Sequence, residues 1–234
     1  MNILGIETST RTGSVAVLCE QGVIAQYSLN IEITHSERLM STVDRVLKDT
    51  GLSLKQIDGF AVAVGPGSFT GLRIGVSTIK GLAFATGKPV AAVPTLKALA
   101  FNVPHAAHPV CPLLDARKNE VYAALYSFEG PALVQVMPEA VISLALLADR
   151  LAGKTVFTGE ASLLFRKELE SLFAGRALFA PRSAVLPSAA AVAEIGLGMI
   201  RAGRHADPDS LTPVYIRRPE AEVVWEKRMK SRSI

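Results

Sequence analysis

A buried-strand pattern passes directly into a glycine-rich segment and then into a helical pattern between residues 60 and 86. The apolar run at 60–64 predicts a strand, and the segment from Gly65 to Gly75, here called the glycine loop, follows it at once. Such a strand–turn–helix unit is typical of α/β folds. Backbone N–H groups at the helix start are able to hold an anion, but the spacing alone favours a tight turn that packs the helix on a sheet.

Neither standard phosphate-binding motif fits the glycine loop. A P-loop requires Gly-Lys followed by Ser or Thr, whereas Leu72 and Arg73 follow Gly71 in this chain. A dinucleotide-binding turn requires its third glycine where this chain has Thr70. The segment therefore predicts a fold unit and identifies no particular nucleotide.

Composition places the chain among soluble globular proteins. Of its 234 residues, 49% are hydrophobic and 20% are charged, which fits one α/β domain or two small ones. The apolar runs near Met1 and at 188–200 are too short for a secretory signal or a bilayer-spanning helix, so we expect neither. Cys19 and Cys111 stand far apart in apolar sequence, so we expect a reduced, cytoplasmic protein.

The net charge of +4 is concentrated at the C-terminal end. Residues 217–234 carry a balance of +3 and the remainder only +1, so the chain lacks a generally basic surface. A basic tail is able to contact RNA phosphates, but such tails are more often simply solvated. The charge alone therefore does not predict a nucleic-acid reader.

The expected elements repeat in the same order in two halves of the chain. Strands are expected at 3–7, 14–19, 23–29, 60–64, 89–93, 110–115, 120–128, 132–136 and 155–158, and helices at 36–50, 73–86, 95–101, 144–151, 163–173 and 189–201. Each half opens with a strand that ends in an acid, Glu7 or Asp115. This order predicts two ribonuclease-H-like lobes with both acids facing a cleft, although each acid could equally just terminate its strand. We expect helix 189–201 to pack across the lobes.

Several sequence blocks resemble one family. They are Ile3-Leu4-Gly5-Ile6-Glu7-Thr8-Ser9-Thr10, His35-Ser36-Glu37, the whole glycine loop, Lys80-Gly81-Leu82-Ala83, Asp115-Ala116-Arg117 and Pro213-Val214-Tyr215. In this order they resemble the TsaB (YeaZ) family of bacterial accessory proteins for tRNA threonylcarbamoyladenosine biosynthesis. The resemblance runs nearly end to end, to about residue 219. It implies the two-lobed actin/Hsp70-like ATPase fold, with lobes at 1–104 and 105–219 and a basic tail at 220–234.

The resemblance also implies a role and partners. In the family, the larger relative TsaD transfers threonylcarbamoyl from threonylcarbamoyl-AMP to adenosine N6 of tRNA, and TsaB-type chains bind and support it. The implied partners are a TsaD-type catalytic subunit, a TsaE-type ATPase, a second copy of the chain when it is alone, and tRNA mainly through the complex. No membrane contact and no cofactor are implied.

The resemblance implies no catalytic residues and no metal ligands in this chain. The His-x3-His metal pair of the larger relative is absent, and Thr10-Arg11 stands where that relative has Cys-Asp. His105, His108 and Cys111 have a spacing imaginable for zinc, but no fourth ligand is evident. The family fold retains a vestigial nucleotide cleft, which maps here to Glu7, Thr8, Ser9, Gly67, Ser68, Thr70, Gly71 and Asp115.

The family's partner surface maps to the helices at 36–50 and 73–86. A stripe of small and apolar residues on these helices would allow close helix packing in an intersubunit bundle, and the expected members are Ile74, Ser77, Thr78, Gly81, Leu82, Ala85, Leu39 and Val43. The other interpretation is that the stripe packs on its own sheet. Two rival functions stay open: an active ATP-dependent phosphotransferase of the same superfamily, and a metallopeptidase, against which the missing His pair argues.

Overall fold

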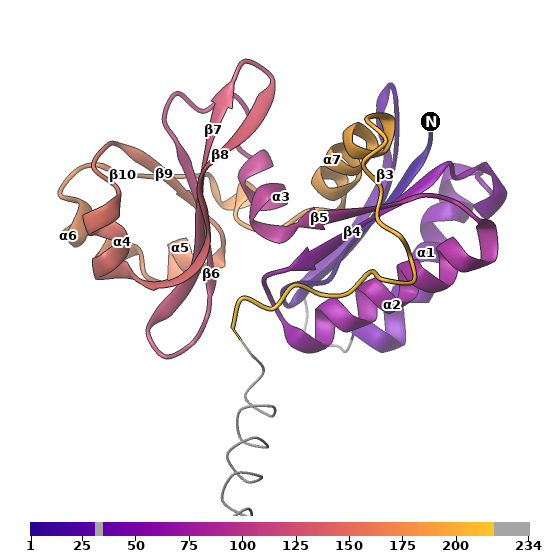
Figure 1. Cartoon of the computed structure of the whole chain (residues 1–234), viewed down its shortest axis with the longest axis horizontal. Coiled ribbons are helices and arrows are strands. Elements are labelled where there is room, and N and C mark those ends of the chain that lie inside the picture. The colour runs from indigo at the N-terminus through magenta and orange to yellow at the C-terminus, as the bar shows by residue number, and fades with distance from the viewer. Residues whose placement is uncertain (31–34, 218–234) are drawn as a thin grey trace, which may run out of the picture.

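The computed structural model describes residues 1–30 and 35–217. Two five-stranded mixed sheets lie side by side, and helices cover both faces of each sheet (Figure 1). The α/β class and the two-lobed organisation predicted from the sequence are therefore confirmed. In the described part of the chain, no helix is long and apolar enough to cross a membrane.

The first sheet has the strand order β3-β2-β1-β4-β5. Its strands are β1 (Ile3–Glu7), β2 (Thr12–Cys19), β3 (Gly22–Asn30), β4 (Gly59–Gly65) and β5 (Val90–Pro94). Helices α1 (His35–Thr50) and α2 (Phe69–Thr86) pack on one face, and α7 (Ala189–Arg201) packs on the other (Figure 1). Because β1 and β4 are buried on both faces, both lack polar residues at alternate positions, and Glu7 at the end of β1 is their one charged residue.

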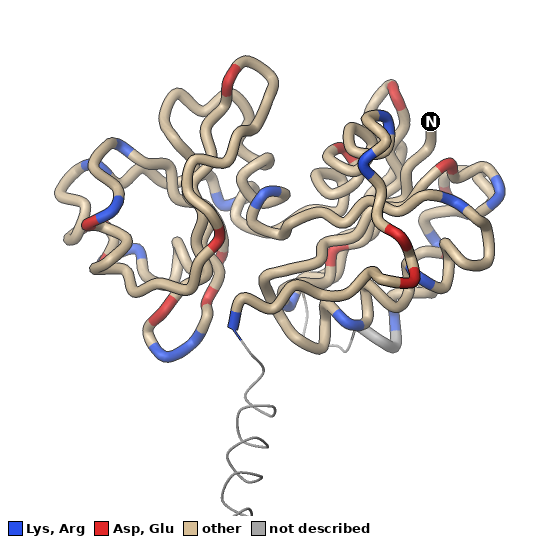
Figure 2. The backbone as a smooth tube through the Cα atoms, in the orientation of Figure 1, with Lys and Arg blue, Asp and Glu red and all other residues tan. Residues whose placement is uncertain are grey.

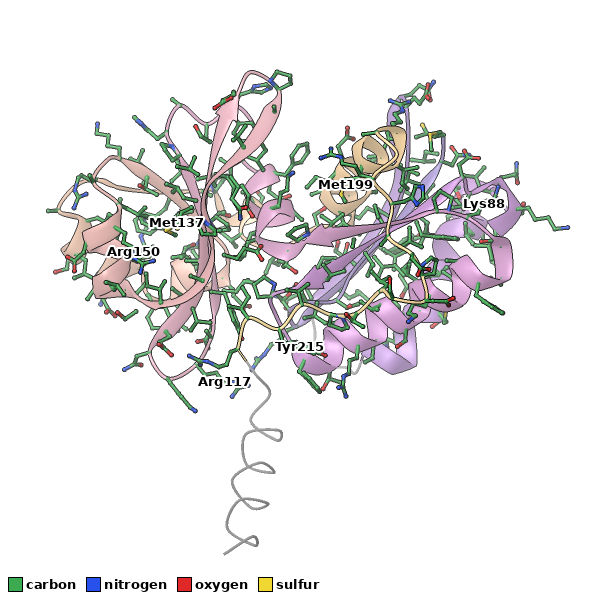
Figure 3. The ribbon with its side chains drawn as sticks, in the orientation of Figure 1. Lys88, Arg117, Met137, Arg150, Met199 and Tyr215 are labelled. Atoms are coloured by element: carbon green, nitrogen blue, oxygen red, sulfur yellow. The ribbon has the colours of Figure 1, made fainter. Side chains whose placement is uncertain are left out.

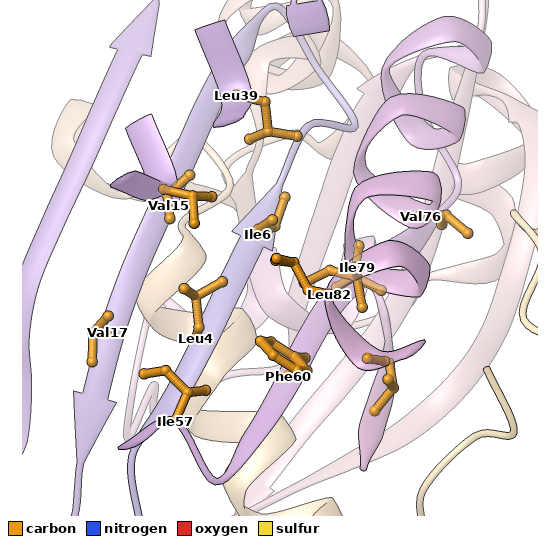
Figure 4. Close-up of a cluster of buried hydrophobic side chains, with 14 of the residues drawn as sticks. Leu4, Ile6, Val15, Val17, Leu39, Ile57, Phe60, Val76, Ile79 and Leu82 are labelled. Atoms are coloured by element: carbon orange, nitrogen blue, oxygen red, sulfur yellow. The ribbon is translucent and has the colours of Figure 1, made fainter. Parts of the chain in front are cut away.

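Alternate side chains of β1 point to opposite faces of this sheet and pack into different cores. Leu4 and Ile6 belong to the core beneath α1 and α2, together with Phe60 and Ile79 (Figure 4). Ile3 belongs to the core beneath α7. Period-two alternation of this kind is what a strand between two helical layers requires.

The second sheet repeats the same topology, with the order β8-β7-β6-β9-β10. Its strands are β6 (Val110–Asp115), β7 (Glu120–Glu129), β8 (Ala132–Ser143), β9 (Thr155–Thr158) and β10 (Ala177–Phe179). Helices α4 (Leu144–Arg150), α5 (Glu160–Leu164) and α6 (Arg166–Phe173) contribute to one core of this lobe. Helix α3 (Thr95–Phe101) contributes to the core on the other face.

The structure corrects several details of the sequence analysis. Helix α7 has the predicted bounds, but it packs on β1, β2, β4 and β5 of the first sheet and does not run across the lobes as expected. The predicted helix at 163–173 is two helices, because Phe165 departs from helical geometry between them. Strand β8 continues to Ser143, and β10 was not predicted. The boundary expected at residue 104 falls between the two sheets and stays a prediction.

A C-terminal segment, residues 204–217, runs along α2 after α7 ends, and we call it the strap (Figure 1). Lys80 on α2 donates hydrogen bonds to the carbonyl groups of Asp209 (3.0 Å) and Leu211 (3.4 Å). Leu211 is buried in the core beneath α2, and Val214 N–H donates to the Val64 carbonyl at 2.7 Å. The strap therefore belongs to the first lobe. The basic tail predicted at 220–234 lies outside the described residues.

Candidate functional site

Glu7, at the end of β1, is completely buried. One oxygen of its carboxyl group accepts a hydrogen bond from the Ser9 backbone N–H at 2.7 Å. The other oxygen and the Ser9 hydroxyl have no hydrogen-bond partner among the described residues. Burial raises the pKa of Glu7 to about 7, against the opposing effect of the hydrogen bond from Ser9 N–H.

The glycines of the glycine loop are needed by the chain's own packing. A Cβ on Gly67 would lie within 3.0 Å of the Ser9 carbonyl oxygen, and one on Gly65 would lie equally close to the Val214 carbonyl oxygen. A Cβ on Gly75 would meet the Thr8 hydroxyl at a similar distance. The close approach that the glycines permit is thus made to residues 8–11 after β1, which we call the β1 turn, and to the strap.

Hydrogen bonds join the glycine loop to the β1 turn. Thr8 donates its hydroxyl to the Gly71 carbonyl at 2.8 Å, and Ser68 N–H donates to the Ser9 carbonyl at 2.6 Å. Ser68 caps α2, because its hydroxyl accepts from Gly71 N–H at 3.3 Å. Thr70 is exposed. The structure therefore brings together the predicted residues of the first lobe, and it does so through contacts within the chain.

Asp115 occupies the matching position in the second lobe, at the end of β6, but it is exposed. Its carboxylate accepts a hydrogen bond from Arg117 N–H at 2.7 Å. The sequence analysis missed Glu160 at the start of α5, whose pKa is raised by burial and then by the charge of Asp115. Glu160 in turn contributes to the raised pKa of Glu7. Glu160 thus interacts electrostatically both with Glu7 of the first lobe and with Asp115 of the second. That Glu7 and Asp115 themselves face a common cleft stays a prediction.

The residues predicted for the partner surface divide into two groups. Leu39, Val43 and Leu82 lie in the core beneath α1 and α2, so these three side chains are not on the surface of this chain. The other members of the stripe lie on α2 and are exposed or half-buried: Ile74, Ser77, Thr78, Gly81 and Ala85.

Two exposed apolar side chains on these helices were missed by the sequence analysis. Phe84 on α2 is 88% exposed, and Met40 on α1 is 53% exposed. Phe84 lies one turn beyond Gly81, so the two share one face of the helix. A Cβ on Gly81 would meet nothing within 4 Å, so the fold itself gives no reason for a glycine there.

The His-x2-His-x2-Cys spacing does not form a cluster of ligands. Cys111 is buried on β6, which raises the pKa of its thiol, while His105 is exposed and lies near the Phe128 ring. Among the described residues, no three His, Cys, Asp or Glu side chains lie together in a way that could hold a metal ion.

Comparison with known sequences identifies close relatives along the whole chain. A family model for TsaD, the tRNA N6-adenosine threonylcarbamoyltransferase, matches residues 23–225. The tRNA threonylcarbamoyladenosine biosynthesis protein TsaB of Bacillus subtilis is 34% identical over 98% of this chain and 100% of its own length. TsaB of Escherichia coli is 33% identical over 97% of this chain and 98% of its own length.

Solved structures agree with the sequence relatives. A Pseudomonas aeruginosa protein with similarity to peptidase YeaZ superposes with a TM-score of 0.79 at 29% identity, covering 92% of this chain and 99% of its own. The ROK hexokinase of Thermus thermophilus has a TM-score of 0.52 at 12% identity, covering 86% of this chain and 100% of its own, and that likeness concerns the fold alone. The two lobes thus have the predicted actin/Hsp70-like ATPase fold. The chain belongs to the TsaB family of tRNA threonylcarbamoyladenosine biosynthesis proteins.

Proposed function

We propose that the chain is a noncatalytic accessory subunit that binds and supports a TsaD-type transferase. That enzyme transfers threonylcarbamoyl from threonylcarbamoyl-AMP to adenosine N6 of tRNA. The observation that carries the proposal is the outer face of α2, where the exposed Phe84 lies beside Gly81, a glycine that its own fold does not need.

The outer face of α2, which we define as Ser77, Gly81, Phe84 and Ala85, is suited to helix packing. A glycine inside an exposed helix costs about 1 kcal/mol relative to alanine, so its presence calls for another reason. A missing side chain lets a second helix approach closely, and an adjacent aromatic ring supplies apolar area to bury. Met40 is a further exposed apolar side chain, on α1, and α1 packs against α2. Helices of a TsaD-type subunit would complete a bundle with α1 and α2.

The vestigial cleft supports the noncatalytic part of the proposal. Glu7 is buried and bonded to Ser9, so its carboxyl group is out of reach of a ligand in solvent. The glycine loop is packed against Ser9, Thr8 and Val214 and is not held open for a phosphate. The chain would therefore contribute a surface to the reaction, while the TsaD-type subunit contributes the chemistry.

The other proposed partners are a second copy of the chain, a TsaE-type ATPase and tRNA. A second copy of the chain would use α1 and α2 in an isologous dimer, which competes with the TsaD-type subunit. A TsaE-type ATPase would act on the assembled pair, and tRNA would bind mainly through the complex. We place this assembly in the cytoplasm, where tRNA is modified.

The experiment is threonylcarbamoyl transfer to tRNA with the TsaD-type and TsaE-type partners and ATP, with and without this chain. We expect modification to require the chain. Gly81→Arg should abolish binding to the TsaD-type subunit while the variant stays folded. Gly198→Arg is the matched control, because Gly198 is also an exposed helical glycine with nothing within 4 Å of its Cβ position. Modification at full rate without the chain would overturn the proposal.

An ATP-dependent phosphotransferase is the alternative function. It is favoured by the equivalent strand-end positions of Glu7 and Asp115, together with Glu160. The alternative requires Mg-ATP to bind the isolated chain with micromolar affinity and to be turned over. Calorimetric titration with Mg-ATP measures the affinity, and an ATPase assay of the isolated chain measures turnover. An accessory subunit with a packed glycine loop should show no turnover.

A further inference from the structure

Two connecting segments join the lobes, and they lie together. The chain enters the second lobe through residues 102–109, after α3, and returns through residues 180–188, before α7. The Asn102 side chain donates a hydrogen bond to the Leu186 carbonyl at 2.8 Å, which holds the two segments side by side. Helix α3 lies between the two sheets, with Ala98 in the core beneath α7 and other residues in a core of the second lobe (Figure 1). Two adjacent connections of this kind allow the lobes to rotate about a common line, as a hinge does.

The strap is anchored to the first lobe along one face of α2. Phe69, Arg73 and Lys80 lie four and seven residues apart, so their side chains share that face. The Phe69 ring stacks on the Tyr215 ring with centroids 4.7 Å apart, and Arg73 donates a hydrogen bond to the Tyr215 hydroxyl at 3.2 Å. Lys80 donates hydrogen bonds to two carbonyl groups of the strap further along α2. The strap therefore moves with the first lobe.

The end of the strap reaches the second lobe through Arg217. Its guanidinium forms an ion pair with Glu120 and donates a hydrogen bond to the Ala116 carbonyl. Arg217 and Glu120 are half-buried, so salt screens their attraction less than that of a fully exposed pair. In Figure 2 the described part of the strap ends in a basic segment, and acidic segments of the second lobe lie at the same lower edge. Arg217 thus links the lobes without passing through the connecting segments.

This link lies at the far end of β6 from the point where the chain enters the second sheet. The entry is at Val110 and β6 ends at Asp115, about 17 Å away at 3.3 Å per residue. The turn at 117–119 follows, and Figure 3 shows Arg117 at the same edge of the molecule as Tyr215 of the strap. A contact at this distance resists rotation about the connecting segments more strongly than a contact close to them.

The turn that Arg217 contacts depends on its surroundings for its shape. All three residues at 117–119 have left-handed φ values, 62°, 57° and 58°. Residues with a Cβ persist in this region only where neighbouring groups fix them. Ala116 N–H donates to the Glu120 carbonyl at 2.9 Å and so closes the turn, while Arg217 holds the Ala116 carbonyl and the Glu120 carboxylate. Backbone exchange in the turn therefore reports whether the Arg217 contact is made.

We propose that the strap is a brace that fixes the angle between the two lobes, carried by α2 on one side and secured by Arg217 to Ala116 and Glu120 on the other. Release of the Arg217 contact lets the lobes rotate about the connecting segments. Glu160 of the second lobe contributes to the raised pKa of Glu7 in the first, so the brace also fixes the separation of these two acids. The inference concerns the chain alone and does not rest on the proposed function.

The test is single-molecule Förster transfer between dyes on Lys55→Cys in the first lobe and Lys167→Cys in the second, with Cys19→Ser in the background. Both lysines are exposed, whereas Cys111 is buried and out of reach of the dyes. With the strap unaltered, we expect one narrow distance distribution. Arg217→Ala should broaden this distribution, because only the connecting segments would then restrain the lobes.

Amide hydrogen exchange gives a second measurement. In Arg217→Ala, exchange of the Ala116 N–H should rise about 10-fold, since a hydrogen bond to a charged group changes an equilibrium constant by about that factor. Adding Glu120→Ala should broaden the distance distribution no further, because the two side chains act through one contact. Arg201→Ala is the matched control, since Arg201 also pairs with a distant glutamate, Glu20, but within the first lobe.

A broadened distance distribution and faster exchange in Arg217→Ala, with both unchanged in Arg201→Ala, support the inference. An unchanged distance distribution overturns it even if exchange rises, because the contact would then shape only the turn. Equal broadening in the control also overturns it. The partners are absent from these measurements, so their failure leaves the proposed function untouched, whereas modification that proceeds without the chain overturns the proposed function alone.

Discussion

Gly67 and Ser9 are in direct backbone contact, although they lie on different loops. The Ser9 carbonyl oxygen accepts a hydrogen bond from Ser68 N–H at 2.6 Å, and it occupies the space that a Cβ on Gly67 would need. The glycine loop therefore packs on the turn after β1, whose Ser9 N–H also donates a hydrogen bond to the buried Glu7. The glycine loop resembles a phosphate-binding loop in sequence, but in this chain it packs against the turn after β1 and connects β1 to α2 through contacts within the chain.

The first prediction concerns this joint. Gly67→Ala should destabilise the chain, because Gly67 has a φ of 157° and its Cβ position is occupied by Ser9. We expect about 1–3 kcal/mol from the backbone conformation and about 1–3 kcal/mol more from overpacking. Urea unfolding measures the sum. Gly22→Ala is the control, since Gly22 also has a positive φ, 126°, but open space at its Cβ, and equal losses in both variants would contradict the packing argument.

The second prediction separates two glycines of α7. Gly196 faces the first sheet, and a Cβ there would lie within 3.0 Å of the Ala61 Cβ. Gly198 is exposed, with nothing within 4 Å of its Cβ position. Gly196→Ala should lower the free energy of unfolding by about 1–3 kcal/mol, and Gly198→Ala should raise it by up to about 1 kcal/mol. Thermal unfolding of both variants tests the opposite signs, and a shift of the same sign in both would count against the packing of α7 on β4.

The sequence predicted the elements well where periodicity and breakers agree. Strand β1, strand β4 and helix α7 were placed nearly to the residue, because apolar runs end at Glu7, Gly65 and Gly203. Helix α2 ends at Thr86 as expected, but it begins at Phe69, four residues before the predicted start. The sheet that α7 covers was not predicted. Both sheets have an apolar face on which α7 could pack. The packing of α7 on the first sheet is close at Gly5 and Gly196, and these contacts join residues far apart in the chain.

The candidate site shows the same division between local and distant signals. The strand-end positions of Glu7 and Asp115 followed from local pattern. The contacts of Gly65 with Val214 and of Arg217 with Glu120 join residues about a hundred or more positions apart, and no local pattern marks them. Phe84 was overlooked because an aromatic residue in a helix is usually buried, so only its exposure in the folded chain distinguishes it.

The third prediction tests the proposed partner surface. Phe84→Ala should weaken binding to the TsaD-type subunit by about 2 kcal/mol, roughly 30-fold, as is typical of an aromatic residue at the centre of an interface. The substitution should hardly change the stability of the isolated chain, because the side chain is 88% exposed. Calorimetric titration of the variant with the TsaD-type subunit provides the measurement.

A matched control for Phe84 lies on the second lobe. Leu164 at the end of α5 is 65% exposed, so Leu164→Ala also removes an exposed apolar side chain. We expect Leu164→Ala to bind the partner as the unaltered chain does. If both substitutions weakened the affinity for the TsaD-type subunit equally, the effect would be a general one of the surface, and the outer face of α2 would not be the partner-binding site.

The fourth prediction is a pH dependence that originates at Glu7. Its pKa is raised from 4.5 to about 7, chiefly by burial, so the folded chain holds a proton that the unfolded chain loses near pH 4.5. The stabilisation from this proton is complete below pH 4.5 and is lost as the pH rises toward 7. Glu7→Gln keeps the acceptor for Ser9 N–H but cannot ionise. Relative to the unaltered chain, the variant should therefore gain about 2–3 kcal/mol in free energy of unfolding between pH 5 and pH 8.

Urea unfolding at both pH values measures the gain, with Glu168→Gln on the surface of α6 as the control. Parallel pH curves for Glu7→Gln and the unaltered chain would show that Glu7 is ionised inside the fold, and an ionised Glu7 would reopen the cleft to a cation.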